Sequence, residues 1–343
     1  MADLLEVFDV REDFARPGSF FRGRARPVLA VDGISFNIAS GTTFGLVGES
    51  GSGKSTVARM CLGLLRPTSG TIRFSGQDLF AGPQRESRAR GGEIGAIFQD
   101  PYAALNPRKR VRDIVSLPLR LHRRTGRGET TQQVINLLEA VSLTPALRYI
   151  DRFPHELSGG QRQRVVIARA IALQPRMLVA DEPVSALDMS IRAQILKTLA
   201  DLKEAYKLTY LFITHDLGVA RSTCNRIGVM YLGRLVEVAA VDDLYTHPLH
   251  PYTRLLLEAT PNPNPTQARA RPHTIIKGEI PSPANPPSGC RFHPRCPLAE
   301  PRCSREDPQV TRIGGSLVAC HLYTGTGGSS TSGTSAKQRS ISA

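Results

Sequence analysis

The chain has few cysteines, no long apolar run and no pattern of a secretory signal. Two cysteines precede residue 290 and the other four lie in the last quarter of the 343 residues, which is not typical of a disulfide-stapled secreted fold. No segment approaches the ~20 apolar residues needed to span a bilayer. Asp3, Glu6 and Asp9 stand where a signal peptide would carry a basic region. We therefore expect a cytoplasmic protein.

Basic stretches interleaved with aromatic residues are also lacking, although the formal net charge is +14. Such a charge is compatible with nucleic-acid binding. The arginines, however, are spread over 22–26, 108–112, 123–127 and the C-terminal quarter, without the aromatic side chains that stack on bases. The composition therefore favours a solvated basic surface, with anionic lipid as one candidate neighbour, and no nucleic-acid partner.

A glycine-rich segment, Gly48-Glu-Ser-Gly-Ser-Gly-Lys-Ser-Thr56, follows the apolar run 43–47 and precedes the helix-compatible run 57–62. Glycines let backbone N–H groups converge on phosphate oxygens, and the following helix adds the positive end of its dipole. Lys54 is placed to reach the β- and γ-phosphates, and the Ser55 hydroxyl to hold Mg²⁺. This order of strand, loop and helix predicts a nucleotide site.

The apolar run 177–180 ends in two acidic residues, Asp181 and Glu182. A carboxylate at the end of a core strand can reach Mg²⁺ through water, which suits Asp181. Glu182 would point to the other side of the strand, where it could orient or deprotonate an attacking water. A strand can also end in acids merely because its end is solvated. The phosphate loop makes us favour the functional interpretation.

The segment Leu157-Ser-Gly-Gly-Gln161 predicts the start of a helix. Ser158 can cap that helix, and the free N–H groups of its first turn would form a second anion site. An ordinary capped helix start is the alternative.

The strand and helix patterns alternate, which predicts a mainly parallel α/β sheet. The helical pattern from Pro101 to about Pro175 interrupts this alternation as an insertion. Proline-rich composition marks a linker from residue 260 to 289, and a Gly/Ser/Thr-rich tail after Tyr323 is expected to be disordered. The expected strands are 4–10, 28–38, 43–47, 71–74, 94–98, 177–180 and 210–213, with a helix at 190–207 and a hairpin at 229–238.

The motifs GESGSGKST, Gln99, LSGGQ, MLVADEP, Ser185-Ala-Leu-Asp188 and His215, in this order, resemble the ATPase subunit of an ABC transporter. The resemblance covers residues 1 to roughly 258. It implies a P-loop ABC ATPase fold with antiparallel N-terminal strands, an inserted helical subdomain at about 101–175 and a small cysteine-containing extension. The nucleotide-binding domain would be 1–258, the linker and cysteine region 259–323, and the tail 324–343.

The same resemblance implies a role for each matching residue. Glu182 resembles the catalytic base, His215 a γ-phosphate contact, and Gln99 a metal sensor linked to the membrane subunits. Ser55, Gln99 and Asp181 would hold Mg²⁺. In this family two subunits face each other, so Ser158, Gly160 and Gln161 of one would complete the ATP site of the other, with Asp188 on the seam. The implied ATP-binding residues are Gly48, Ser50, Gly51, Gly53, Lys54, Ser55, Thr56 and the LSGGQ residues of the second subunit. Phe14 is the candidate for adenine stacking, with Phe20 and Phe21 also near.

Four stretches resemble the oligopeptide and dipeptide importers: residues 99–107, 278–286, 247–252 and the cysteine segment 290–296. The resemblance is closer to the F-type ATPase subunit of these systems. It implies a second, different ATPase subunit, two membrane permeases and an extracytoplasmic substrate-binding protein, with this chain peripheral on the cytoplasmic face of the inner membrane. The alternative is a soluble ABC-type ATPase acting on nucleic acid, with a zinc-binding C-terminal module. The coiled-coil insertion or second cassette of such ATPases does not occur in this sequence.

The C-terminal cysteines are Cys290, Cys296, Cys303 and Cys320. Their spacing matches neither zinc ribbons nor ferredoxins, which leaves an iron–sulfur centre, zinc and free thiols open. The region has little apolar content, so a metal could supply the order that a core cannot. The resemblance to peptide importers implies a [4Fe–4S] cluster on these four residues, with zinc as the alternative and His293 or His321 able to replace a thiol.

Overall fold

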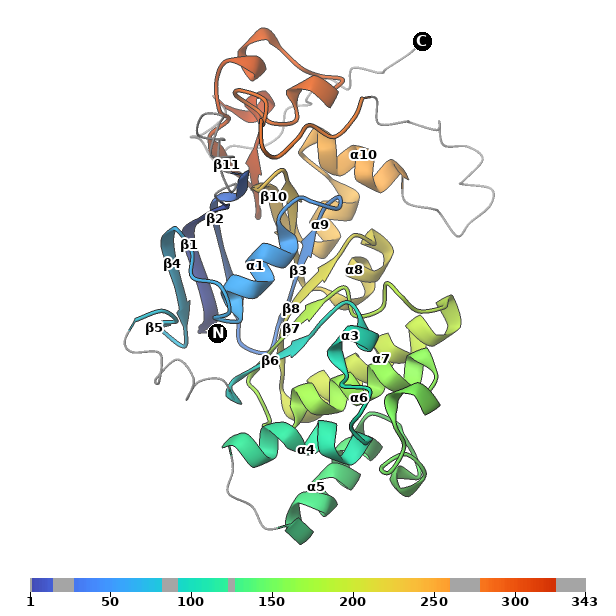
Figure 1. Ribbon diagram of the computed structural model, residues 1–343. Helices are drawn as coiled ribbons and strands as arrows, with labels where there is room; N and C mark the ends of the chain where they lie inside the picture. Colours follow the sequence, from blue (N-terminus) through green and yellow to red (C-terminus); the bar gives the residue numbers. More distant parts are fainter. Residues whose placement is uncertain (1, 15–27, 82–91, 123–126, 260–277, 325–343) are drawn as a thin grey trace, which may run out of the picture.

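The computed structural model describes residues 2–14, 28–81, 92–122, 127–259 and 278–324 (Figure 1). Phe20, Phe21, much of the expected proline-rich linker and nearly all of the expected disordered tail lie outside these residues. None of the described helices is long and apolar enough to cross a membrane.

The first strands form a four-stranded antiparallel sheet in the order β2-β1-β4-β5. Along β2, buried Val31, Ile34, Phe36 and Ile38 are largely interspersed with more exposed residues, as expected of strands with one buried face. The sequence-based prediction of antiparallel N-terminal strands is therefore confirmed. The bounds are β1 Asp3–Phe14, β2 Val28–Ala39, β4 Ser69–Phe74 and β5 Gln77–Asp78.

The second sheet has eight strands in the order β11-β12-β10-β9-β3-β8-β7-β6. Its middle is parallel, with β3 between β8 and β9 and with β7 between β8 and β6. The strands at the other edge, β10, β12 and β11, pair antiparallel. The bounds are β3 Thr43–Val47, β6 Ile94–Ile97, β7 Met177–Asp181, β8 Thr209–Thr214, β9 Arg226–Tyr231, β10 Arg234–Ala240, β11 Val310–Ile313 and β12 Ser316–Ala319.

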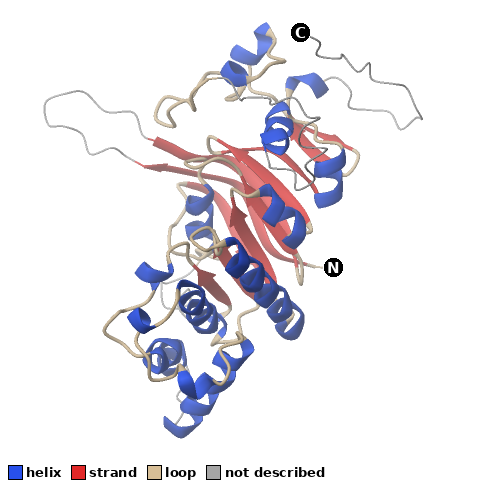
Figure 2. Cartoon of the chain, turned by 90° about the vertical axis from the view of Figure 1, so that its right-hand side faces the viewer, coloured by secondary structure: helices blue, strands red, loops and turns tan. Residues whose placement is uncertain are grey.

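The central parallel strands are buried on both faces, which is why they are almost continuously apolar in sequence. Successive residues of β8 point to opposite cores: Leu211 and Ile213 pack with the N-terminal sheet and α1 (Lys54–Cys61), and Tyr210 and Phe212 with the helices on the other side. In Figure 2 the strands form a twisted band through the middle of the molecule, with helices packed along it and beyond its ends.

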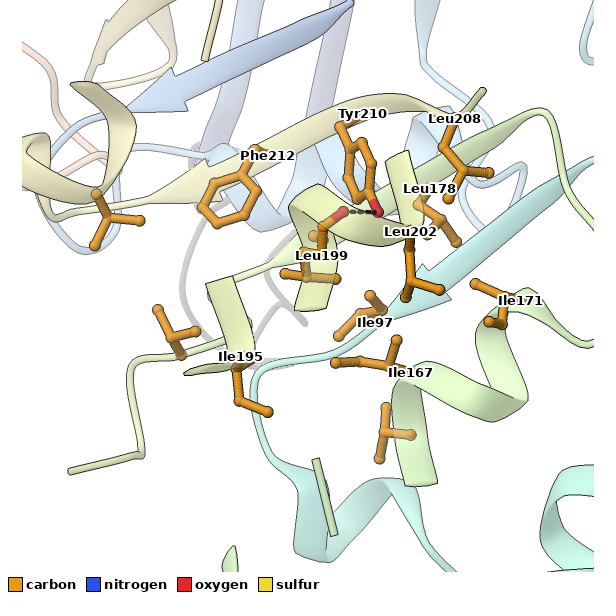
Figure 3. Packing of buried hydrophobic residues seen from close by; sticks show 14 of the residues in the cluster. Ile97, Ile167, Ile171, Leu178, Ile195, Leu199, Leu202, Leu208, Tyr210 and Phe212 are labelled. Atoms are coloured by element: carbon orange, nitrogen blue, oxygen red, sulfur yellow. Dashed lines mark hydrogen bonds between the residues drawn. The ribbon is translucent and has the colours of Figure 1, made fainter. Parts of the chain in front are cut away.

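The core behind Tyr210 joins the sheet to α6 (Gly159–Ile171) and α7 (Met189–Tyr206), as Figure 3 shows. Ile167 and Ile171 of α6 and Leu199 of α7 approach the strands there, and the Tyr210 hydroxyl donates to the Leu199 carbonyl oxygen at 3.1 Å. This packing fixes α6, and with it the segment that precedes α6, against the sheet.

The predicted helical insertion forms between β6 and β7 and lies at one end of the molecule, with the C-terminal region at the other (Figure 1). Its helices are α3 Pro101–Ala104, α4 Val111–His122, α5 Arg127–Ala140 and α6, with 3₁₀ turns at Ala146–Arg148 and Pro154–Glu156. After β8 follow α8 Leu217–Thr223, α9 Val241–Thr246 and α10 Pro251–Ala259.

The C-terminal residues differ from the expectation because they join the main sheet. Val318 and Leu317 of β12 pair with Glu237 and Val238 of β10, and Val318 is fully buried. Three 3₁₀ turns, η4 His293–Arg295, η5 Pro301–Ser304 and η6 His321–Tyr323, complete the region. Ladder hydrogen bonds and the shared core thus order a segment whose own apolar content is low.

Candidate nucleotide site

The phosphate loop, residues 48–56, connects the buried strand β3 to α1 and is packed too closely for side chains at two glycines. A Cβ at Gly48 would lie 2.1 Å from the Met230 carbonyl oxygen, and one at Gly53 would lie 2.2 Å from that of Ala30. Gly53 also has φ of 103°, which favours glycine. The loop is therefore held against β9 and β2, while Ser50 and Gly51 form its turn and Lys54, Ser55 and Thr56 make up the first turn of α1.

Lys54 is buried and points back over the loop. Its Nζ donates to the carbonyl oxygens of Gly48 and Glu49, both at 2.8 Å. Burial lowers the pKa of Lys54, so its charge is poorly solvated in this arrangement. A cation in such surroundings fits a site for an anionic ligand such as phosphate.

The predicted Mg²⁺ ligands are partly brought together. Burial raises the pKa of the Asp181 carboxyl group at the end of β7, and the neighbouring Ser55 hydroxyl partly offsets this effect. Asp181 Oδ1 is buried and, among the described residues, has no hydrogen-bond partner. An unpaired carboxylate oxygen beside a serine hydroxyl fits a hard divalent cation. Gln99, the third predicted ligand, does not contact Asp181 but donates a hydrogen bond to the next residue, Glu182.

Glu182 is held at both carboxylate oxygens. Gln99 Nε2 donates to Oε2 at 3.2 Å, and His215 Nδ1 lies 3.1 Å from Oε1. The three residues follow the ends of β6, β7 and β8, which are neighbours in the parallel sheet. Glu182 has φ of 48°, an unfavourable conformation for a residue with a side chain and one that is found at functional sites.

The LSGGQ segment, residues 157–161, starts α6 as expected. Gln161 N–H donates to Ser158 Oγ at 3.3 Å, and Ser158 N–H donates to Gln161 Oε1 at 3.0 Å, which is a capping box. A Cβ at Gly160 would lie 2.5 Å from Ile191 Cγ2, so α6 packs closely on α7 there. Ser158 is exposed, and within the described residues no hydrogen bond or ion pair joins this segment to the phosphate loop.

Phe14 lies at the end of β1, where it pairs with Val28 of β2. Its side chain is 40% exposed. Val28 is two residues from Ala30, whose carbonyl oxygen lies against Gly53. The paired strands β1 and β2 thus run past the phosphate loop, and Phe14 lies at the end of β1 that is near this loop.

The predicted [4Fe–4S] cluster, and zinc as its alternative, are not supported by the structure. Cys290, Cys296, Cys303 and Cys320 line a cavity of about 10 Å³, roughly the space of one water. Among the described residues, no group of three or more His, Cys, Asp or Glu side chains is arranged to hold a metal ion. Burial raises the pKa of Cys296 and of Cys320 to about 11. The order that we attributed to a metal comes from β12 and from the packing described above.

One feature of the site has no signal in the sequence: the C-terminal region contacts the phosphate loop. Arg295 pairs with Glu49, although 246 positions separate them. Glu49 and Arg295 were therefore missing from the predicted site.

Comparison with known proteins agrees with this geometry. A family model described as ABC transporter matches residues 31–185, and one described as oligopeptide/dipeptide transporter, C-terminal region, matches residues 236–303. The oligopeptide transport ATP-binding protein AppF of Bacillus subtilis is 46% identical over 93% of this chain and 97% of its own length. The di/tripeptide transport ATP-binding protein DppF of Pseudomonas aeruginosa is 43% identical over 94% and 98%.

Among solved structures, the dimeric structure of a bacterial ABC transporter cassette is similar, with a TM-score of 0.62 and 28% identity over 69% of this chain and 98% of that one. A related dimer, in a post-hydrolysis state bound to ADP and phosphate, has a TM-score of 0.61. The chain therefore belongs to the ABC transporter family as one of its ATP-hydrolysing subunits, and it carries the C-terminal region of the oligopeptide/dipeptide group.

Proposed function

We propose that the chain is the energy-coupling ATPase of an ABC importer for peptides. The observation that carries the ATPase assignment is Glu182, held by Gln99 and His215 beside the phosphate loop. The peptide assignment is supported by the C-terminal family match and by relatives that are named as oligopeptide and di/tripeptide transport proteins.

In this proposal the loop residues hold the nucleotide. Backbone N–H groups of the loop and the Lys54 ammonium bind phosphate oxygens, and Ser55 with Asp181 holds Mg²⁺. Bound Mg²⁺–ATP supplies the phosphoryl group and the charge that neutralises the β- and γ-oxygens. The contributing loop residues are Gly48, Ser50, Gly51, Gly53, Lys54, Ser55 and Thr56, and Phe14 stacks on the adenine.

Glu182 accepts the proton of the attacking water. Its two oxygens are oriented by Gln99 and His215, so the carboxylate is fixed before water arrives. Gln99 also belongs to the segment between β6 and the helical insertion, and in this proposal it links the site to the membrane subunits. His215 additionally contacts the γ-phosphate in the closed state.

The site is completed by a second subunit. The exposed Ser158, with Gly160 and Gln161, would bind ATP held by a different ATPase subunit, and Asp188 would lie on the seam between them. Two permeases and an extracytoplasmic substrate-binding protein form the rest of the importer. The chain would sit peripherally on the cytoplasmic face of the inner membrane, with 1–258 as nucleotide-binding domain and 259–323 as linker and C-terminal region.

The test is peptide uptake in a strain that lacks this gene. We expect loss of uptake of labelled di- or oligopeptides, restored by the wild-type gene and not by Glu182→Gln expressed at the same level. Normal uptake of a broad peptide set in the deletion strain, while the purified protein hydrolyses ATP, would contradict the peptide assignment and leave the ATPase assignment in place.

A further inference from the structure

The C-terminal region reaches the phosphate loop through one buried ion pair. Arg295 donates from Nη1 to Glu49 Oε2 at 2.8 Å and from Nη2 to Glu49 Oε1 at 3.1 Å. The Arg295 side chain is only 5% exposed and that of Glu49 22%. Two parallel charge-assisted bonds fix direction as well as distance. Glu49 therefore has a defined orientation that the rest of the loop does not supply.

Glu49 is also tied to the residues that handle the nucleotide. Its carbonyl oxygen accepts from Lys54 Nζ at 2.8 Å, and its N–H donates to the Tyr252 hydroxyl at 3.1 Å. Arg295 thus binds the side chain of the same residue whose backbone carbonyl oxygen holds Lys54. A shift of Glu49 would therefore move its carbonyl oxygen. Lys54 must turn away from this oxygen before its ammonium group can reach a phosphate.

The contact is backed by a rigid aromatic cluster of Tyr231, Tyr252 and Phe292. The ring centroids lie 4.7 to 5.2 Å apart, and the three side chains are almost fully buried. The Tyr231 hydroxyl also accepts from Arg295 Nη1 at 3.2 Å. Arg295 therefore cannot swing away without disturbing this cluster.

A different set of contacts fastens the C-terminal region to the body of the protein. Arg291 donates to Asp32 and to the Leu232 carbonyl oxygen, and Asp32 also pairs with Arg11 and Arg234. The β12–β10 ladder adds to this attachment. Attachment of the C-terminal region to the protein therefore does not depend on the Arg295–Glu49 pair. That pair instead joins the C-terminal region to a residue of the phosphate loop.

We propose that Arg295 is a positioning residue for the nucleotide site, through which the C-terminal region sets the affinity of the phosphate loop for ATP. The proposal rests on the ATP site described above. Because coupling between two sites is reciprocal, bound ATP also tightens the docking of the C-terminal region.

The test compares full-length Arg295→Gln, Glu49→Gln and the double variant by direct titration with a fluorescent ATP analogue and by steady-state hydrolysis. We expect each single change to weaken ATP binding about fivefold or more and to raise KM more than it lowers kcat. The double variant should be no weaker than the single ones, because both remove the same interaction.

Arg302→Gln is the matched control. Arg302 lies in the same region and donates to Glu300 and to the His321 carbonyl oxygen, without a contact to the loop. Its ATP affinity should equal that of wild type. If Arg295→Gln does not fold, the ATP affinity of Glu49→Gln alone tests the proposal. The Glu49 side chain is partly exposed, so its replacement disturbs the packing less.

Four outcomes distinguish the possibilities. Unchanged ATP affinity in the folded Arg295 or Glu49 variant overturns the inference, and so does an equal loss in Arg302→Gln. Additive losses in the double variant would also overturn it, since the two residues would then act separately. A wild-type protein that does not bind ATP would instead refute the proposed nucleotide site.

Discussion

At the scale of single residues, Glu182 is the group whose replacement should affect ATP hydrolysis without affecting ATP binding. We expect Glu182→Gln to keep ATP affinity and to lower hydrolysis by on the order of 10²-fold or more, because the amide cannot accept a proton. The phosphate loop is untouched by the change. Single-turnover and steady-state hydrolysis in the assembled complex measure the effect.

Lys54→Ala is the contrasting variant, since it should lose nucleotide affinity itself. Turnover at the wild-type rate in the Glu182→Gln complex would show that another group activates the water.

At the scale of elements, the residue directly before α10 is a buried histidine that should make stability depend on pH. His250 Nδ1 accepts from the Tyr252 N–H at 3.0 Å, and burial lowers the pKa of His250 to about 3. The unfolded chain binds the proton near the ordinary pKa of 6.5. Stability from neutral His250 is therefore complete above pH 6.5 and is lost as the pH falls toward 3, by up to about 1.4 kcal/mol per pH unit.

His250→Asn keeps an oxygen that can accept the same N–H and removes the titration. Urea unfolding between pH 7 and 4 should show a flatter dependence for this variant than for wild type. Glu237 is buried nearby and titrates in both proteins, so the difference between them isolates His250. Parallel curves would mean that His250 is solvated or already protonated in the folded state.

At the scale of the whole molecule, the separation of the LSGGQ segment from the phosphate loop predicts weak activity for the isolated chain. Each site would need Ser158 and Gly160 from a partner subunit, so hydrolysis should be slow and should rise when the second ATPase subunit and the permeases are added. Hydrolysis rate against protein concentration measures this dependence. Full activity in a proven monomer at high dilution would contradict the shared site.

Much of the site could be predicted from sequence because each motif is local and physically constrained. The phosphate loop needs its glycines within a few residues, and Asp181 and Glu182 directly follow a continuous apolar strand. The capping box of Ser158 and Gln161 is likewise a relation between near neighbours. These patterns also identified the parallel core, since strands buried on both faces must be apolar throughout.

The tertiary structure decided what depends on residues far apart in the chain. Gln99, Glu182 and His215 meet only because β6, β7 and β8 are adjacent, which sequence spacing does not encode. The order of the C-terminal region is mispredicted from sequence for the same reason: its own composition is poor in apolar residues, which led to the incorrect prediction of a metal site. Its stability instead comes from pairing with β10, from Phe292 against two tyrosines, and from arginines that reach Asp32 and Glu49 across most of the chain. Local chemistry could be predicted from sequence because its partners are near neighbours, whereas long-range pairs form only when the completed sheet brings their elements together.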